Sequence, residues 1–367
     1  MNHVRLITTH ETINQHEDAT MKKLVKGNEA VVIGGLVAGC DAYFGYPITP
    51  ASEIAHAAAA YFTRLGKIFI QAESEISAIN MVYGASACGK RVMTASSGPG
   101  LSLKQECISF MAGAQLPAVI VDINRCGPGL GNIGPEQSDY FQVVKGGGHG
   151  NYRTIVLAPN SVAEMYEMTI KAFDLADRYR TPVYLLSDAL LGQMMEPIDI
   201  VPIEIHRPTK PWRLDTTAAT NDNHITSIYL DFDDMEAYSN QLNAKWRGIA
   251  EREAQAETYK TEDAEVIVTG FGIISRQLKS VVDLLREQGL PVGMIRPKTL
   301  WPFPTRTYRD QAREYTRFLV VELSAGQMID DVRLAVPHNE IAFHGRGGGN
   351  LPTQEAIIEE IRKLLEK

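Results

Sequence analysis

Short apolar runs recur through the first half of the chain, and polar or turn-forming residues follow each of them at once. Four such junctions carry chemically useful side chains, at residues 46–50, 71–75, 96–100 and 123–125. Strands that are covered on both faces of a parallel sheet have this continuous apolar pattern. Ligands of open α/β sheets bind at the carboxyl ends of the strands. The pattern therefore predicts an α/β fold with a functional site at these four strand ends.

A chain of 367 residues is long for one core, and the order of elements predicts two open parallel-sheet domains. In the first domain, residues 21–196, we expect strands at 41–45, 67–71, 91–96, 116–124, 154–158 and 183–187, and helices at 31–40, from 53, at 74–89, 101–112 and 161–179. Residues 197–263 contain prolines and charges and are interpreted as a connector with a helix near 235–257. In the second domain, residues 264–367, we expect strands at 265–269, 292–296, 317–322 and near 341, and helices at 275–288 and 353–367. The polar residues 1–20 are expected to form a flexible extension.

Composition and charge narrow the class of protein. The fractions of hydrophobic (44%) and charged (22%) residues are typical of a globular protein, and the formal charge of −8 argues against binding nucleic-acid phosphates. The four cysteines lie far apart, without the spacing of zinc or iron–sulfur sites, so we expect no metal on this chain. Because no apolar run approaches the roughly 18 residues of a membrane helix and no signal peptide begins the chain, we expect a cytoplasmic protein without a membrane partner.

The loop at residues 46–50 fixes a polar side chain in place. Pro47 and Pro50 bracket Thr49, and each proline restricts both its own φ and the residue before it. Thr49 is therefore predicted to lie in a rigid loop at a strand end. The structural alternative is that Thr49 or Ser52 caps a helix that starts at Glu53.

Glu75 stands at the start of a helix that is otherwise uncharged. Ser74 is a good N-cap, which places Glu75 in the first turn, where the helix dipole favours a carboxylate. Residues 76–89 contain no charged side chain, so the helix is expected to be buried and its first turn to face a cleft or a partner. The alternatives are a surface glutamate matched to the dipole, or a functional role for Glu73 at the same strand end.

Arg125 follows the apolar strand 116–124 directly. A guanidinium group pairs bidentately with a carboxylate, so Arg125 is a candidate for binding an acidic substrate. The structural alternative, which explains Arg125 equally well, is an ion pair with Glu73 or Asp122. The glycine-rich turn at 96–100 can hold an anion at a helix start, although such turns often only reverse the chain.

Two further glycine-rich segments offer weaker signals. Residues 129–134 match the dinucleotide fingerprint, but Pro135 follows at once and no acidic residue lies between Phe141 and Val162 to hold a ribose. A nicotinamide or flavin site is therefore not the preferred interpretation of residues 129–134. His149 lies in a second such loop and could either reach a site or remain solvated.

Taken together, the motifs resemble one family, the α subunits of the thiamine-diphosphate-dependent 2-oxoacid:ferredoxin oxidoreductases, over roughly residues 25–365. The resemblance rests on the sequences at 46–50, 71–75 and 127–131, which occur together in that order. The segment 190–197 adds a resemblance to the branched-chain type, which acts on 3-methyl-2-oxobutanoate. The family fold implies a pyrimidine-binding-type domain followed by a transketolase C-terminal-like domain.

The resemblance also implies roles for individual residues. It places Glu75 against the pyrimidine ring of thiamine diphosphate, where a glutamate favours the tautomer that removes the reactive proton, and Pro47 and Ile48 beside that cofactor. It places Thr49 and Arg125 at the carboxylate of the 2-oxoacid. The implied reaction is oxidative decarboxylation to acyl-CoA and CO2, with the electrons passing to ferredoxin.

The chain lacks the Gly-Asp-Gly motif that holds magnesium and the diphosphate in this family. The resemblance therefore implies a β subunit that carries the diphosphate and Mg site, small γ or ferredoxin-like subunits that carry iron–sulfur clusters, and coenzyme A and ferredoxin as further partners. Two alternatives stay open. One is the same chemistry on 2-oxoglutarate or an aryl pyruvate, and the other is a non-catalytic ligand-binding or assembly subunit.

Overall fold

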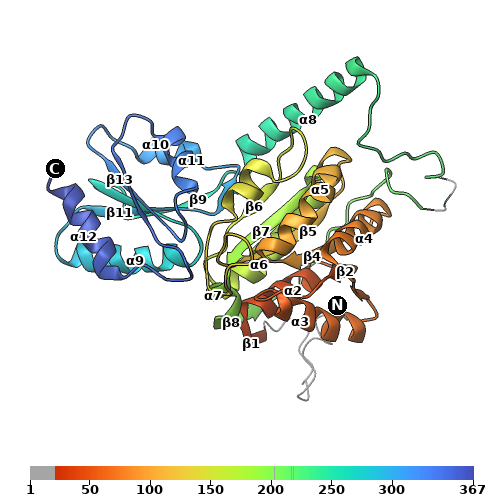
Figure 1. The fold of residues 1–367 in the computed structure, drawn as a ribbon, viewed down its shortest axis with the longest axis horizontal. Coiled ribbons are helices and arrows are strands. Elements are labelled where there is room, and N and C mark those ends of the chain that lie inside the picture. Colours follow the sequence, from red (N-terminus) through yellow and green to blue (C-terminus); the bar gives the residue numbers. More distant parts are fainter. Residues whose placement is uncertain (1–20, 202, 216, 218) are drawn as a thin grey trace.

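The computed structural model describes residues 21–201, 203–215, 217 and 219–367, which form two α/β units side by side (Figure 1). The first unit lies to the right in Figure 1, and the second, coloured in blues, lies to the left. The expected flexible extension, residues 1–20, lies outside the described residues.

The first unit is built on a seven-stranded sheet. Its strands are β2 (Ala42–Gly45), β3 (Ile68–Gln71), β4 (Val92–Ser96), β5 (Ala118–Asn124), β6 (Ile155–Leu157), β7 (Pro182–Asp188) and β12 (Thr299–Trp301). They are arranged in the order β12-β6-β7-β5-β4-β2-β3, and all neighbours are parallel except β12, which runs antiparallel to β6. Every residue of β4, β5 and β7 is buried, which explains their nearly unbroken apolar sequences.

Helices cover both faces of this sheet. The helices α2 (Gly27–Val37), α3 (Ser52–Arg64) and α6 (Val162–Tyr179) pack on one face, and α4 (Glu75–Ala87) and α5 (Gly98–Gly113) pack on the other. Successive residues of β5 alternate between the two cores, with Val119 and Val121 in the first and Ile120 in the second. Smaller elements complete the unit: the antiparallel pair β1 (Met21–Lys26) and β8 (Met195–Ile200), the short helix α7 (Ala189–Gln193) and the π-helical turn η1 (Gln142–Gly146).

The second unit is a five-stranded sheet with two helices on each face. Its strands are β9 (Ala256–Tyr259), β10 (Val266–Thr269), β11 (Val292–Pro297), β13 (Arg317–Glu322) and β14 (Ile341–Gly345), in the order β14-β13-β10-β11-β9. Only β9 is antiparallel to its neighbour. The helices α9 (Gly272–Glu287) and α12 (Gln354–Leu365) contribute to one core, and α10 (Thr305–Gln311) and α11 (Met328–Ala335) to the other.

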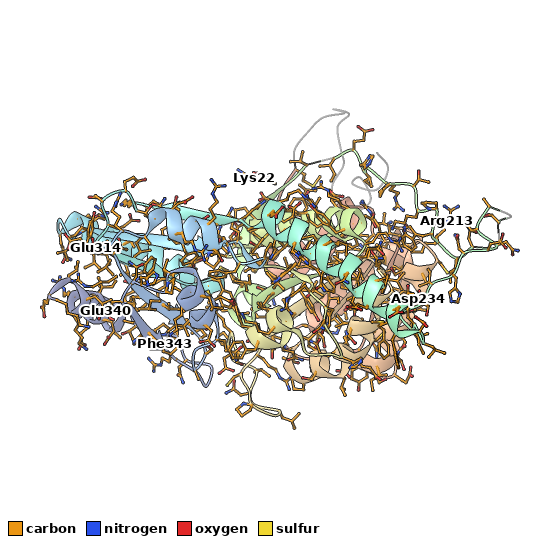
Figure 2. All side chains as sticks on the ribbon, turned by 90° about the horizontal axis from the view of Figure 1, so that it is seen from above. Lys22, Arg213, Asp234, Glu314, Glu340 and Phe343 are labelled. Atoms are coloured by element: carbon orange, nitrogen blue, oxygen red, sulfur yellow. The ribbon has the colours of Figure 1, made fainter. Side chains whose placement is uncertain are left out.

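The long helix α8 (Phe232–Glu253) joins the two units. Its first turn, marked by Asp234 in Figure 2, lies at the end of the molecule opposite Glu314 and Glu340 of the second unit. The helix then runs back along the first unit towards β9 (Figure 1). No helix among the described residues is long and apolar enough to cross a membrane.

The strands and helices expected from the apolar pattern are present, whereas several elements were not expected. The sequence did not predict β1, β8, β9 or β12, or the helices α7, α10 and α11. Residues 197–263 are more than a connector, because they supply β9 to the second sheet. The unexpected strands β1, β8, β9 and β12 are short edge strands whose pairing partners lie far away in the chain. The local sequence pattern carries little information about such pairs.

Two helix starts differ from expectation. Ala51 occupies the N-cap position of α3, and no side chain caps this helix, so the structural alternative, in which Thr49 or Ser52 caps it, is wrong. Helix α5 begins at Gly98 rather than at residue 101, because Pro99 in its first turn is compatible with a helix start.

A buried arginine ties the two units together. Arg296 of β11 is 1% exposed and forms a two-pronged ion pair with Glu164 of α6, in which Nη1 lies 2.6 Å from Oε2 and Nη2 lies 2.8 Å from Oε1. Its Nε donates to Glu257 Oε2 of β9 at 3.0 Å. Hydrogen bonds and charge from Arg296 lower the pKa of Glu164 to about 2, although burial opposes this shift. The network, in which Lys298 Nζ also lies 3.1 Å from Glu164 Oε1, therefore connects the second sheet to α6 of the first unit.

Two polar side chains make a second connection near the strand ends. The side chain of Gln137 donates from Nε2 to the Phe271 carbonyl at 2.8 Å and accepts from the Leu323 N–H at 3.0 Å. Asp188, at the end of β7, accepts from the Ile273 N–H at 3.3 Å. Burial raises the pKa of Asp188 to about 6 despite its hydrogen bonds to backbone N–H groups. These contacts hold the start of α9 against the carboxyl edge of the first sheet.

Candidate active site

The carboxyl ends of β2 and β5 bring Thr49 and Arg125 together. The guanidinium of Arg125 donates from Nη1 to the Thr49 carbonyl at 2.9 Å and from Nη2 to the Leu130 carbonyl at 3.1 Å. The Thr49–Pro50 peptide is cis, and the Thr49 side chain is exposed. The structural alternative for Arg125 was an ion pair with Glu73 or Asp122. Within the described residues Arg125 forms neither of these ion pairs. The guanidinium is thus fixed by backbone carbonyls beside an exposed hydroxyl group.

Glu75 is the buried carboxylate of this region. Ser74 caps α4 as predicted, with its Oγ accepting from the Ser77 N–H at 3.2 Å, and Glu75 is only 7% exposed. A Cβ placed on Gly100 would lie 2.5 Å from Glu75 Oε1, so the carboxylate rests against the first turn of α5. Glu73 is exposed and accepts a hydrogen bond from Ser77. The expected burial of Glu75 is confirmed, whereas Glu73 at the same strand end is exposed.

The remaining predicted cofactor contacts, Pro47 and Ile48, are half-buried in the β2–α3 loop, where Ile48 packs on the core. A buried carboxyl group normally has a hydrogen-bond donor, and Glu75 has none among the described residues. Gly100, which has no side chain, lies against this carboxyl group. A nitrogen on the pyrimidine edge of thiamine diphosphate could supply the missing hydrogen bond. The residues present are therefore compatible with this cofactor.

A cavity of about 1010 Å3 opens beside Arg125, between the first and second units. Its walls include Gly98 and Asp139 from the first unit and Ser324, Phe343 and Gly347 from the second. Phe343 is labelled in Figure 2 on the flank of the second unit, near its junction with the first. The second unit thus forms part of the wall next to the predicted substrate residues, which the sequence did not indicate.

Glu136 holds the loops of this cavity in place. Its Oε2 accepts from the Gly127 N–H at 2.9 Å and from Ser138 Oγ at 2.5 Å, and its Oε1 accepts from the Gly348 N–H at 3.2 Å. A Cβ on Gly134 would lie 2.8 Å from Gly349 Cα, so the two glycine-rich loops approach too closely for a side chain there. The Glu136 carboxylate, the close glycine contact and a hydrogen bond from Asn132 Nδ2 to the Gly348 carbonyl at 3.3 Å therefore hold residues 126–134 against residues 345–350.

The other glycine-rich candidates behave as follows. Residues 129–134 form turns without a helix start and end at a bridge between Arg125 and Pro135, in agreement with the rejection of a dinucleotide site. His149 is exposed and does not line the cavity.

Behind Glu75 lies a buried polar cluster that the sequence analysis missed. Lys104 is fully buried on α5, and its Nζ donates to Thr94 Oγ1 at 2.7 Å and to the Ala95 carbonyl at 3.0 Å. Asp122 is also fully buried. Lys104 lies on the same helical stripe as Leu101 and Ile108, at spacings of three and four residues. That periodicity is the signal that could have identified it as a buried lysine.

Comparison with known proteins decides the family. The family model for pyruvate flavodoxin/ferredoxin oxidoreductase, thiamine diphosphate-binding, matches residues 34–266, and the model for pyruvate:ferredoxin oxidoreductase core domain II matches residues 264–357. The chain belongs to this family. Thiamine diphosphate is therefore the cofactor of its first matched domain, and the chain is a subunit of a 2-oxoacid:ferredoxin oxidoreductase.

Individual relatives agree. The ketoisovalerate oxidoreductase subunit VorB of Methanothermobacter marburgensis is 55% identical over 343 residues, covering 93% of this chain and 97% of the relative. The 2-oxoglutarate synthase subunit KorA of the same organism is 34% identical, covering 93% and 99% of the two chains.

Solved structures support the fold. A 2-oxoglutarate:ferredoxin oxidoreductase from Magnetococcus marinus, with 2-oxoglutarate, coenzyme A and succinyl-CoA bound, superimposes with a TM-score of 0.85 at 28% identity, covering 96% of this chain and 67% of that one. A split-gene transketolase shares only the fold, with a TM-score of 0.58 at 11% identity, covering 93% and 97%. The resemblance and the fold class expected from the sequence are confirmed.

Proposed function

We propose that this chain is the α subunit of a cytoplasmic branched-chain 2-oxoacid:ferredoxin oxidoreductase. With a β subunit it would convert 3-methyl-2-oxobutanoate to acyl-CoA and CO2 and pass the electrons to ferredoxin. The observation that carries the proposal is the arrangement at the strand ends, where Arg125 and Thr49 stand together and the buried Glu75 faces Gly100. The 55% identity to a ketoisovalerate oxidoreductase subunit, against 34% to a 2-oxoglutarate synthase subunit from the same organism, favours the branched-chain substrate.

Each site residue has a proposed task. Thiamine diphosphate, when bound, supplies the carbanion that attacks the 2-oxoacid carbonyl. Glu75 would share a proton with the pyrimidine edge, with Pro47 and Ile48 packing beside the ring. Arg125 would bind the substrate carboxylate, and the exposed Thr49 hydroxyl would donate a further hydrogen bond.

The cavity supports a substrate with one carboxylate. Among the residues that line it in the described part of the chain, Arg125 is the one lysine or arginine. A second carboxylate, as in 2-oxoglutarate, would need another cation, because an unpaired charge is costly to desolvate. The cavity is also larger than a small 2-oxoacid requires, which leaves space for the acyl acceptor coenzyme A.

The partner subunits remain part of the proposal. We assign the diphosphate and Mg site to the β subunit and the iron–sulfur clusters to small γ or ferredoxin-like subunits. Exposed apolar side chains on β3, α4 and α5 offer a surface for the β subunit next to Glu75. They are Ile68 (47% exposed), Ile70 (40%), Ile76 (49%), Leu103 (50%) and Phe110 (41%). A patch of this kind beside an incomplete site is typical of a subunit interface.

The test is an assay of the assembled enzyme. The chain is co-expressed anaerobically with β and small subunits, and viologen reduction is followed with coenzyme A and a panel of 2-oxoacids. We expect branched-chain 2-oxoacids to give the highest kcat/KM. A preference for 2-oxoglutarate or an aryl pyruvate would overturn the substrate assignment, and an assembled complex without reduction of the dye would favour a non-catalytic subunit.

Arg125→Lys tests the substrate carboxylate site. Lysine keeps the charge, but it cannot hold the Thr49 and Leu130 carbonyls and also present a planar fork to a carboxylate. We expect KM for the 2-oxoacid to rise by about 10- to 100-fold, as for the loss of a charged hydrogen bond of roughly 1.5–3 kcal/mol. Steady-state kinetics give the split between kcat and KM. Arg306→Lys, at an arginine whose side chain is 94% exposed, serves as the control, and equal KM values for both variants would contradict the assignment.

A further inference from the structure

A separate cavity, of about 330 Å3, lies beside α8. Three segments that are far apart in the chain form its walls: the residues just before β6, one stripe of α8, and the last residue of β12. The stripe on α8 consists of Asn243, Trp246, Arg247 and Ala250. Their spacings of three and four residues place these side chains on one face of the helix.

The direction of the strands separates this cavity from the one beside Arg125. Residues 151–153 precede β6, so they lie at the amino end of a strand that runs parallel to β7. Arg125 follows the carboxyl end of β5, which also runs parallel to β7. The two cavities share no lining residue in the described part of the chain. A ligand beside α8 would therefore sit at the opposite edge of the first sheet from the groups proposed to act on the 2-oxoacid.

The charged side chains in the walls are both arginines. Arg153 and Arg247 line the cavity, and no aspartate or glutamate among the described residues does so. Arg153 Nη1 donates to the Tyr152 carbonyl at 3.1 Å. Neither arginine forms an ion pair within the part of the chain that the structure describes, although Glu251 follows Arg247 one turn along α8. Two guanidinium groups without a carboxylate partner favour an anionic ligand, because guanidinium binds phosphate bidentately.

Aromatic rings form much of the remaining wall. Two of the three tryptophans of the chain, Trp246 and Trp301, line the cavity together with Tyr152. Trp246 and Tyr152 are each 6% exposed, and Trp301 is half-buried, so packing restricts all three rings. The indole N–H of Trp246 is buried without a hydrogen-bond partner among the described residues, whereas such donors are normally satisfied. These rings offer flat apolar faces on which an aromatic base can stack.

We propose that this cavity binds a nucleotide, with the base against the tryptophans and the phosphate on Arg153 and Arg247. A neutral aromatic compound would leave the two arginines without a counter-charge, and an inorganic anion would leave the rings without a partner. The volume lies at the lower end of the range for small-molecule sites, roughly 300–1,000 Å3, which fits a mononucleotide better than a dinucleotide. The amide groups of Asn151 and Asn243 supply donors and acceptors for the edge of a base.

The test is isothermal titration calorimetry of the full-length chain with AMP, CMP, adenosine and inorganic phosphate. We expect AMP and CMP to bind, and adenosine and phosphate to bind at least about 10-fold more weakly, because each lacks one of the two recognised groups. AMP should also change the tryptophan fluorescence, since two of the three tryptophans line the cavity. Absence of AMP and CMP binding would overturn the proposal, and so would equal affinities for phosphate and AMP, which would indicate an unspecific anion patch.

Arg247→Gln locates the site. Arg247 is exposed and forms no ion pair among the described residues, so its replacement should not disturb folding. We expect the affinity for AMP to fall by about 10- to 100-fold, as for the loss of one charged hydrogen bond. Arg252→Gln is the matched control, because Arg252 is an exposed arginine on the same helix that contacts Tyr179 and does not line the cavity. The proposal fails if Arg247→Gln binds AMP as wild type does, or if Arg252→Gln loses as much affinity.

Trp301 tests the stacking surface. Trp301→Leu keeps an apolar side chain but removes the ring, and it should weaken AMP binding by about 5-fold or more. Trp301→Phe retains a ring and should stay within about 2-fold of wild type. Equal affinities of the leucine and phenylalanine variants would contradict stacking of the base. Coenzyme A carries the same base and phosphate chemistry as AMP. Its competition with AMP, lost in Arg247→Gln, would identify the bound nucleotide as the end of that molecule, whereas binding of AMP without competition would identify a free nucleotide.

Discussion

Glu75→Gln is expected to reduce 2-oxoacid-dependent viologen reduction by the assembled enzyme by about 10²- to 10⁴-fold. Glutamine has nearly the same size, so the packing of α4 against Gly100 should be preserved. The amide cannot share a proton with the pyrimidine ring as a carboxyl does. The loss should appear mainly in kcat, because the substrate contacts at Arg125 and Thr49 are untouched.

Glu73→Gln provides the matched control for this experiment. Glu73 lies two residues away at the same strand end, but it is exposed and hydrogen-bonded to Ser77. We expect this variant to retain wild-type kinetics. If Glu73→Gln were inactive and Glu75→Gln active, the assignment of the two glutamates would have to be exchanged.

The second large effect is expected on stability. Arg296→Met would leave the Glu164 and Glu257 carboxylates at the junction without their shared cation. Removing one partner of a fully buried ion pair costs about 3–5 kcal/mol. The loss is expected at the lower end of this range, because Lys298 Nζ still lies 3.1 Å from Glu164 Oε1 and the Glu257 side chain is 30% exposed. Denaturant unfolding of the isolated chain would measure this loss. Arg306→Met, which removes an exposed i,i+4 pair with Asp310, should leave the unfolding midpoint unchanged.

The same network has a pH signature. Because the folded-state pKa of Glu164 is lowered to about 2 from its usual 4.5, its contribution to stability is present above about pH 4.5 and is lost as the pH falls towards 2. In Arg296→Met this acid-induced loss of stability should become smaller. An unchanged acid unfolding profile would contradict the assigned role of Arg296.

The parts of the site that follow from local sequence were predictable. Ser74 and Glu75 stand at a helix start that capping rules identify, and Arg125 follows an apolar strand whose end defines the sheet edge. These rules need only neighbouring residues. They fail at α3, where Ala51 takes the N-cap position because the loop of Pro47 and Pro50, rather than a capping side chain, sets the start of the helix.

Contacts between distant segments could not be predicted from the local sequence. Glu136 meets Gly348 across more than half of the chain, and the cavity wall at Phe343 depends on how the second unit docks. Lys104 resembles a surface lysine until its helical stripe is compared with Leu101 and Ile108. Such features depend on packing between units, which no local pattern of the sequence records.

The exchange of strands between the two sheets limits how this polypeptide can be divided. Strand β9 precedes residue 264 and belongs to the second sheet, whereas β12 follows it and completes the first. A gene split at that point would leave β9 on the first fragment, without its partner β11, and β12 on the second fragment, without its partner β6. Each fragment would then have an unpaired sheet edge that could aggregate. Modular reuse of either half therefore requires the cut to be moved or both edges to be rebuilt.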